Sequence, residues 1–163
     1  MDFAKETAQG LLTNYCEVLK ELRLRNLIRS TNNPVADITE TIVALALKLK
    51  LVNGSTAGHD AIDEATGFRY EIKGRRVTRE NKSRQLSFIR GLDKNHFDFL
   101  VGVLFDENFH ITKACLIPKS TVQKLAKYVE HVNGWRLILA DSVWRDAGVQ
   151  DLTEPLQMIL AKL

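Results

Sequence analysis

Residues 58–76 read GHDAIDEATGFRYEIKGRR, and this stretch predicts a β-hairpin. Its two arms, 58–63 and 68–75, contain most of its apolar and aromatic residues, and the turn-forming segment 64–67 separates them. Both arms also carry charged residues, and the alternation of side chains along a strand decides which face of the hairpin those charges occupy.

The turn sets which residues of the two arms lie opposite each other. Pairing of Glu64 with Gly67 places Asp60 opposite Glu71. Lys73 points to the same face as Glu71, because side chains alternate along a strand. The pattern therefore predicts two carboxylates and one amine on a single face of the hairpin.

Two like charges opposite each other destabilise a sheet. For unit charges about 5 Å apart, the repulsion is about 3 kcal/mol at an effective dielectric constant of about 20. A bridging cation relieves it, and oxygen ligands of this kind select Mg²⁺ or Mn²⁺. The alternatives are an ordinary exposed hairpin, or a register shifted by one residue, which would put Asp60 and Glu71 on opposite faces.

The segments GHDAID (58–63) and YEIKGRR (70–76) resemble the motif of the PD-(D/E)XK nuclease superfamily, whose members have the restriction-endonuclease-like fold. In that superfamily, a helix that often contributes a Glu precedes the hairpin, and a helix and a further core strand follow it. The resemblance covers about residues 34–117. The sequence departs from the superfamily pattern at His59, where a Pro is often found.

The resemblance implies a set of functional residues. The implied catalytic residues are Asp60, Glu71 and Lys73, and the implied ligands of Mg²⁺ or Mn²⁺ are Glu40, Asp60, Glu71 and the backbone carbonyl of Ile72. Some members carry a Gln on the following helix and a Tyr four residues later; here Gln85 matches and Ile89 replaces the Tyr. Alternation points His59 away from Asp60, which favours a structural role over contact with substrate or water.

A basic segment includes the second arm and continues beyond it. Residues 69–94 contain nine Lys or Arg and three Asp or Glu, a net charge of +6, whereas the whole chain carries +3. Such a segment is typical of a protein with a phosphate-bearing partner, although a solvated basic loop has the same composition. A short helix is expected at about 83–92, and the candidate nucleic-acid-binding residues are Arg75, Arg76, Arg84, Gln85 and Arg90.

Glu40 lies in a helix predicted from Asn33-Pro34 to about Leu51, ended by Asn53-Gly54. Apolar residues occupy two sides of this helix, which indicates deep burial, and Glu40 lies in the middle of one of them. A carboxylate there needs a cation or several hydrogen-bond donors, unless it reaches solvent at the edge of the core.

The remaining pattern predicts helices at 3–29 and 118–130, a central strand at 97–105, strands at 109–117 and 135–140, and a helical end. The expected fold is α/β, a restriction-endonuclease-like mixed central sheet flanked by helices, with an added N-terminal helix. We expect one domain over 1–163, with an N-terminal helical extension (1–32), a nuclease-like core (33–128) and a C-terminal strand and helix extension (129–163). The apolar stripe of the first helix packs on the chain's own core or, alternatively, in a homodimer interface; it consists of Leu12, Tyr15, Leu19 and Leu22.

The composition, 45% hydrophobic and 26% charged, is that of a soluble globular protein. The longest apolar run is too short to cross a membrane and the first residues lack a signal-peptide pattern, so we expect a cytoplasmic protein. Cys16 and Cys115 have neither the number nor the spacing of a zinc site or a disulfide framework, and both are expected to be buried thiols.

These features predict a Mg²⁺-dependent endonuclease that hydrolyses phosphodiester bonds in DNA, in restriction or DNA repair, with RNA as an alternative substrate. Cutting both strands with one site per chain favours a homodimer. The alternatives are a non-catalytic nucleic-acid-binding or assembly module of the same fold, and a basic surface for an acidic protein partner. Salt-sensitive binding to unrelated DNA sequences would separate these two alternatives.

Overall fold

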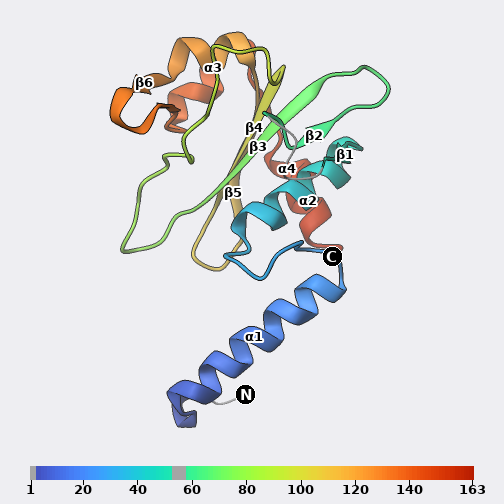
Figure 1. Ribbon diagram of the computed structural model, residues 1–163, viewed down its shortest axis with the longest axis vertical. Helices are drawn as coiled ribbons and strands as arrows, with labels where there is room; N and C mark the ends of the chain where they lie inside the picture. Colours follow the sequence, from blue (N-terminus) through green and yellow to red (C-terminus); the bar gives the residue numbers. More distant parts are fainter. Residues whose placement is uncertain (1–2, 53–57) are drawn as a thin grey trace.

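The structure, a computed structural model, describes residues 3–52 and 58–163. In this part of the chain a mixed sheet has the strand order β1-β2-β3-β4-β5-β8 (Figure 1). Its strands are β1 (Lys50–Leu51), β2 (Ala61–Ile62), β3 (Arg69–Arg76), β4 (Phe99–Phe105), β5 (Ile111–Pro118) and β8 (Gln150–Asp151). Strands β3 and β4 are parallel, and the other neighbours are antiparallel.

Helices flank this sheet, and a small hairpin lies beside it. The α-helices are α1 (Ala8–Leu24), α2 (Val35–Leu47), α3 (Lys119–Leu125) and α4 (Thr153–Leu160), and the short 3-10 helices are η1 (Phe3–Lys5), η2 (Glu130–Val132) and η3 (Asp141–Arg145). The small hairpin consists of β6 (Lys127–Val129) and β7 (Gly134–Arg136). The fold is therefore α/β with a mixed central sheet flanked by helices, as the sequence predicted.

Strand β4 separates two hydrophobic cores. Val101, Val103 and Phe105 belong to the core beneath α2 and α4, whereas Leu100 and Leu104 belong to the core beneath α3 and segment 86–92. Figure 1 shows α2 and α4 on one side of the sheet and α3 with β6 on the other. The prediction of a central strand covered on both faces is confirmed.

Helix α2 crosses β3 at very close range. A Cβ atom at Gly74 would lie 2.1 Å from Oγ1 of Thr39, so only glycine fits beneath the helix there. Thr39 is fully buried, and its hydroxyl donates to the carbonyl of Val35 in the preceding turn. The next residue of α2 is Glu40, which lines the same cleft as Glu71 and Lys73 of β3.

The prediction of a helix at about 83–92 is wrong. Leu86, Ile89 and Leu92 are all buried, and their spacing of three residues imitates the apolar face of a helix. The backbone instead pairs with a distant segment: the N–H of Leu86 donates to Leu137 at 3.0 Å, and the N–H of Ile89 donates to Trp135 at 2.9 Å. Long-range backbone bonds therefore decide the conformation of this connection between β3 and β4.

Other boundaries also differ from the prediction. Helix α2 ends at Leu47 because Lys48 adopts a left-handed conformation, and Asn53 and Gly54 lie outside the described residues. Helix α3 stops at Leu125 and is followed by β6, and the strand expected at 135–140 shortens to β7 with an isolated bridge between Ile138 and Gln85. The helical end is confirmed as α4.

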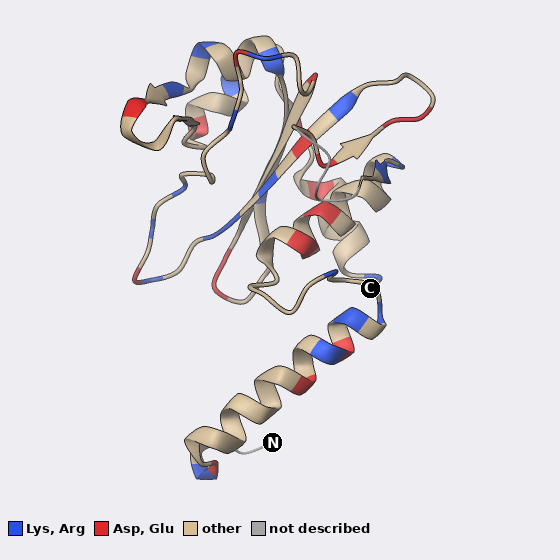
Figure 2. Cartoon of the chain, viewed as in Figure 1, with Lys and Arg blue, Asp and Glu red and all other residues tan. Residues whose placement is uncertain are grey.

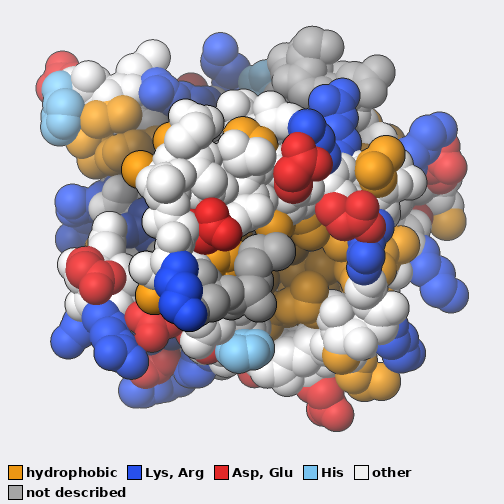
Figure 3. All heavy atoms as spheres, turned by 90° about the horizontal axis from the view of Figure 1, so that it is seen from below, with side chains coloured by type: hydrophobic (Ala, Val, Ile, Leu, Met, Phe, Trp, Pro, Cys, Tyr) orange, Lys and Arg blue, Asp and Glu red, His pale blue; other side chains and the backbone are white. Residues whose placement is uncertain are grey.

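Helix α1 projects away from the sheet (Figure 1). Leu19 is buried, but Leu12 and Tyr15 are exposed, so the prediction that this stripe packs on the chain's own core is wrong for these two residues. Figure 3 views the molecule from the α1 side and shows hydrophobic side chains exposed among charged ones. Cys16 is exposed, against expectation, while Cys115 is buried. None of the described helices is long and apolar enough to span a membrane.

Candidate active site

A cleft of about 370 Å³ lies where the β2–β3 ladder ends. Its walls come from α2, the segment before it, the hairpin and the connection between β3 and β4. The lining residues are Arg29, Glu40, Val52, Gly58, His59, Asp60, Glu71, Lys73, Phe88 and Arg90. All four ionisable residues that the sequence singled out as metal ligands or catalytic groups lie in this one cleft.

The predicted register of the hairpin is confirmed between the turn and Ala61, which pairs with Tyr70. The ladder then changes, because the N–H of Asp60 also points to the carbonyl of Tyr70, at 2.8 Å. Two residues of one strand thus face one residue of the other, as in a β-bulge, and the predicted pairing of Asp60 directly opposite Glu71 is wrong. The Asp60 carboxylate accepts the N–H of Ile72 at 2.7 Å, so a side chain takes the place of the next ladder bond.

Glu71 and Lys73 form an ion pair of 2.8 Å inside the cleft, with side chains only 15% and 12% exposed. Burial raises the pKa of the Glu71 carboxyl above its ordinary value, the charge of Lys73 opposes this shift, and the charge of Asp60 adds to it. Asp60 and Glu71 therefore lie close enough to repel each other. Glu71 is a carboxylate whose ionised form gains from any further positive charge in the cleft.

Glu40 has the cation that its position requires, and the cation is Arg29. The two side chains form an ion pair in which Glu40 is 12% exposed and Arg29 is 41% exposed. Arg29 also donates to the carbonyl of Val52 at 3.2 Å. Asp37 holds the backbone of the segment by accepting the N–H of Arg29 at 3.0 Å and that of Ser30 at 2.8 Å. No sequence pattern links Arg29 to Glu40, because the pairing depends on how the chain enters α2.

His59 lines the cleft together with Asp60, although strict alternation predicted that it would point away. The bulge at Asp60 interrupts the alternation and explains the difference. Among the described residues, Nδ1 of His59 has no hydrogen-bond partner and is buried. The backbone of Gly58 lies directly against His96, because a Cβ atom there would be 2.1 Å from its Nδ1.

The basic residues of segment 69–94 are dispersed rather than gathered. Figure 2 shows Lys and Arg along β3 and along the connection that follows it. Of the five predicted nucleic-acid-binding residues, only Arg90 lines the cleft. Arg75 lies on the same face of β3 as Glu71 and Lys73, and its Nε donates to the carbonyl of Ser83 at 3.0 Å.

The other three of these residues lie elsewhere. Arg76 points to the opposite face of β3, where its guanidinium lies 4.8 Å from the ring centroid of Phe109. Arg84 pairs with Asp141 at 3.1 Å, and Gln85 forms its backbone bridge with Ile138. This placement does not favour direct contact between these residues and a phosphate held in the cleft.

The donor set of the cleft fits a hard cation only in part. Within residues 3–52 and 58–163, no three Asp, Glu, His or Cys side chains are gathered closely enough to hold a metal ion. Asp60 and Glu71 nevertheless repel each other, and the Ile72 carbonyl faces their edge of β3, because the N–H and C=O of one strand residue point to the same side. Two carboxylates and one carbonyl thus lie on this side of the cleft, Glu71 being paired with Lys73, whereas the carboxylate of Glu40 is paired with Arg29.

Comparison of the sequence with protein-family models and with curated proteins gave no match. The function proposed for the cleft therefore rests on the residues that line it.

Proposed function

We propose that this protein is a metal-dependent nuclease that hydrolyses phosphodiester bonds, with Asp60, Glu71 and Lys73 as its catalytic residues. The observation that carries the proposal is the largely inaccessible Glu71–Lys73 ion pair, with side chains 15% and 12% exposed, beside the Asp60 carboxylate in one cleft. Partly buried carboxylates that repel each other destabilise a folded protein, and a cation bound between them would relieve that repulsion. The order of hairpin and parallel core strand is compatible with the PD-(D/E)XK resemblance, whereas the helix of that pattern is missing between β3 and β4.

Mg²⁺ or Mn²⁺ is the proposed cofactor, held by Asp60, Glu71 and the carbonyl of Ile72, with Glu40 as a further ligand. When bound, such an ion lowers the pKa of a coordinated water and neutralises charge on the phosphate oxygens. The ammonium of Lys73, held by Glu71 on the same face of β3, orients the attacking water. Arg90 contacts a phosphate of the substrate at the rim of the cleft.

DNA is the proposed substrate, with RNA as the alternative, and restriction and DNA repair are the proposed settings. The cytoplasmic location stays a prediction. A homodimer would supply a second site for the second strand, and the exposed apolar residues of α1 are the surface we propose for it.

One observation favours a second candidate, a non-catalytic nucleic-acid-binding module. Arg29 occupies Glu40 and supplies a positive charge of its own to the cleft. In that case Arg29, Lys73 and Arg90 would bind a phosphate without an ion, and no bond would be cut.

A cleavage assay distinguishes the two candidates. Labelled single-stranded, nicked and duplex DNA is incubated with Mg²⁺ or Mn²⁺ and wild-type protein, Glu71→Gln or Lys73→Met. We expect cleavage by wild type and a loss of about 100-fold or more in either variant, as for groups that act on the reacting atoms. Glu64→Gln is the matched control, because Glu64 lies in the same hairpin but is exposed and pairs only with Lys50. Wild type that binds DNA with either ion without cutting it would overturn the nuclease and leave the binding module.

A further inference from the structure

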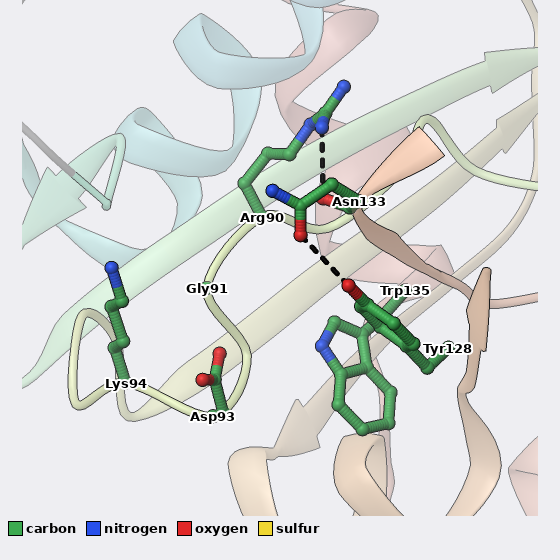
Figure 4. Close-up of a pocket in the computed structure, with 7 residues that line it drawn as sticks. All are labelled: Arg90, Gly91, Asp93, Lys94, Tyr128, Asn133 and Trp135. Atoms are coloured by element: carbon green, nitrogen blue, oxygen red, sulfur yellow. Dashed lines mark hydrogen bonds between the residues drawn. The ribbon is translucent and has the colours of Figure 1, made fainter. Parts of the chain in front are cut away.

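A second cavity, of about 530 Å³, shares Arg90 with the candidate active site. It is formed by the connection between β3 and β4 on one side and by the β6–β7 hairpin on the other (Figure 4). Its lining residues are Arg90, Gly91, Asp93, Lys94, Tyr128, Asn133 and Trp135. Its volume is in the range of sites for small ligands or single substrate groups.

Two aromatic rings form one wall of this cavity. Tyr128 and Trp135 are directly paired across β6 and β7, with ring centroids 5.3 Å apart. Such a pair stabilises a small hairpin, but stabilisation alone does not require the rings to face a cavity. Tyr128 is 51% exposed, and its hydroxyl donates to Oδ1 of Asn133 at 2.9 Å, which fixes the ring at the cavity wall (Figure 4).

Charged groups complete the cavity. Arg90 and Lys94 supply positive charge, and Arg90 is held in place because its guanidinium donates to the carbonyls of Val132 and Asn133. Asp93 lies between the two along the chain and offers carboxylate oxygens as acceptors. An aromatic wall, a basic rim and a carboxylate acceptor suit a planar heterocycle that has N–H donors and is attached to phosphates.

We propose that this cavity binds one unpaired nucleobase of the substrate, stacked on the ring of Tyr128 and with one edge against Trp135, whose ring plane is tilted by 59° to that of Tyr128. The phosphates on either side of that base contact Lys94 and Arg90, and the strand continues past Arg90 into the candidate active site. Asp93 accepts an N–H of the base. The preferred substrate is therefore a nucleic acid with a single-stranded region or an extruded base next to the bond that is cut, rather than a continuous duplex.

The passage of the strand into the active site rests on the proposed function, whereas binding of the base does not. Each base has a π-face, so stacking of this kind tolerates many sequences. The contribution of the phosphates makes the binding sensitive to salt.

The test measures binding without cleavage. Fluorescence anisotropy in EDTA compares a labelled single-stranded oligonucleotide, the same oligonucleotide with abasic positions, and its duplex. Tyr128→Leu removes the ring and keeps apolar volume, and Tyr128→Phe keeps the ring and loses the hydroxyl. We expect Tyr128→Leu to bind the single strand about tenfold more weakly, because the stacking of the base on the ring is lost, and Tyr128→Phe to bind it within about twofold of wild type. Binding of the abasic strand should not respond to Tyr128→Leu.

Phe68→Leu is the matched control, because Phe68 is 45% exposed, outside the linings of both cavities, and undergoes the same change of ring to aliphatic chain. Circular dichroism verifies the fold of each variant. Lys94→Gln is a second variant, which leaves the aromatic pair intact. It should weaken binding of the single strand and lower the salt dependence of that binding. Equal affinity of wild type, Tyr128→Leu and Lys94→Gln for the single strand would overturn the proposal. So would equal affinity of wild type for abasic and complete strands.

The outcome separates this proposal from the nuclease. A protein that binds single strands through Tyr128 and never cuts with Mg²⁺ or Mn²⁺ retains the base site and loses the enzymatic function. A protein that cuts while Tyr128→Leu and Lys94→Gln bind and cleave as wild type retains the function and loses the base site.

Discussion

The carboxylate of Asp60 accepts the backbone N–H of Ile72 at 2.7 Å, at the position where the β2–β3 ladder stops. One side chain thus ends a strand pair and contributes charge to the cleft. The geometry of the hairpin and the electrostatics of Glu71 are coupled through it, since the charge of Asp60 helps to raise the pKa of Glu71.

Asp60→Asn and Asp60→Ala separate these two roles. Asparagine retains an oxygen that accepts from Ile72, so its free energy of unfolding should stay close to that of wild type, while alanine should lose about 1 kcal/mol with the hydrogen bond. Both variants should lose cleavage, and the pKa of Glu71 should fall in both. Urea unfolding and NMR titration of the Glu71 side chain measure these effects. Equal destabilisation by Asn and Ala would show that the hydrogen bond is not what ends the ladder.

The stability of the protein should depend on the ionisation of Glu71. Its pKa is raised in the folded chain above the ordinary 4.5, so the native state holds this proton more tightly than the unfolded state. The corresponding stability is fully present below pH 4.5 and is lost as the pH rises through the native pKa. Wild type should therefore lose stability relative to Glu71→Gln over this window.

Urea unfolding at a series of pH values measures the difference between wild type and Glu71→Gln. Lys73→Met should move the window to higher pH, because Lys73 is the main group that lowers the pKa of Glu71. Parallel stability curves for wild type and Glu71→Gln would contradict the raised pKa.

The Arg29–Glu40 pair should respond asymmetrically to removal of either partner. Arg29→Met leaves a largely buried carboxylate without its cation, whereas Glu40→Gln leaves a half-exposed guanidinium that water can solvate. We expect Arg29→Met to be the more destabilising by about 1–2 kcal/mol. Millimolar Mg²⁺ should restore part of this loss if Glu40 becomes a ligand when Arg29 is absent.

Thermal unfolding with and without Mg²⁺ provides the measurement. The double variant Arg29→Met/Glu40→Gln is the control, since it contains no carboxylate at this position. Stabilisation of the single and double variants by Mg²⁺ to the same extent would remove Glu40 from the proposed ligands.

Gly58 and Gly67 are both in conformations with positive φ, at +93° and +75°, but only Gly58 is crowded. An added Cβ would strike the ring of His96 at Gly58 and would meet nothing within 4 Å at Gly67. Gly67→Ala should cost about 1 kcal/mol from backbone strain alone. Gly58→Ala should cost clearly more, because the ring of His96 has to move. Chemical denaturation of both variants, with NMR of the histidine rings, tests the difference; equal costs would contradict the contact.

Helix α1 should mediate self-association. Tyr15 and Val18 are exposed on one apolar side, so Tyr15→Glu and Val18→Glu should convert a dimer to a monomer. Thr13→Glu adds the same charge to the same helix at a residue whose hydroxyl donates to the carbonyl of Gln9 within the helix, and it should have no effect. Sedimentation velocity measures the outcome. A wild type that is monomeric at high micromolar concentration would remove the homodimer from the proposed function.

Local physics explains what could be predicted from the sequence. The turn at 64–67 and the alternation of the strands predicted the pairing of the hairpin as far as Ala61, because both act over neighbouring residues. The apolar run at 97–105 predicted the central strand, and the apolar neighbours of Glu40 predicted its need for a cation. These signals depend on residue type and spacing alone. The predicted deep burial of α2 on two sides is wrong, because Leu45 is 50% exposed.

Tertiary contacts decided the rest. The bulge at Asp60 brought His59 into the cleft, and the path of the chain before α2 supplied Arg29 as the partner of Glu40. Segment 83–92 has the spacing of a helix, but its backbone bonds to residues 135–139 outweigh that local preference. The same pairing places Arg90 between the cleft and the aromatic cavity, a position that no local pattern encodes. The sequence by itself thus determined the hairpin and the presence of Asp60, Glu71 and Lys73 on it. Only the tertiary structure decided which residues surround these three, because those residues lie far from the hairpin along the chain.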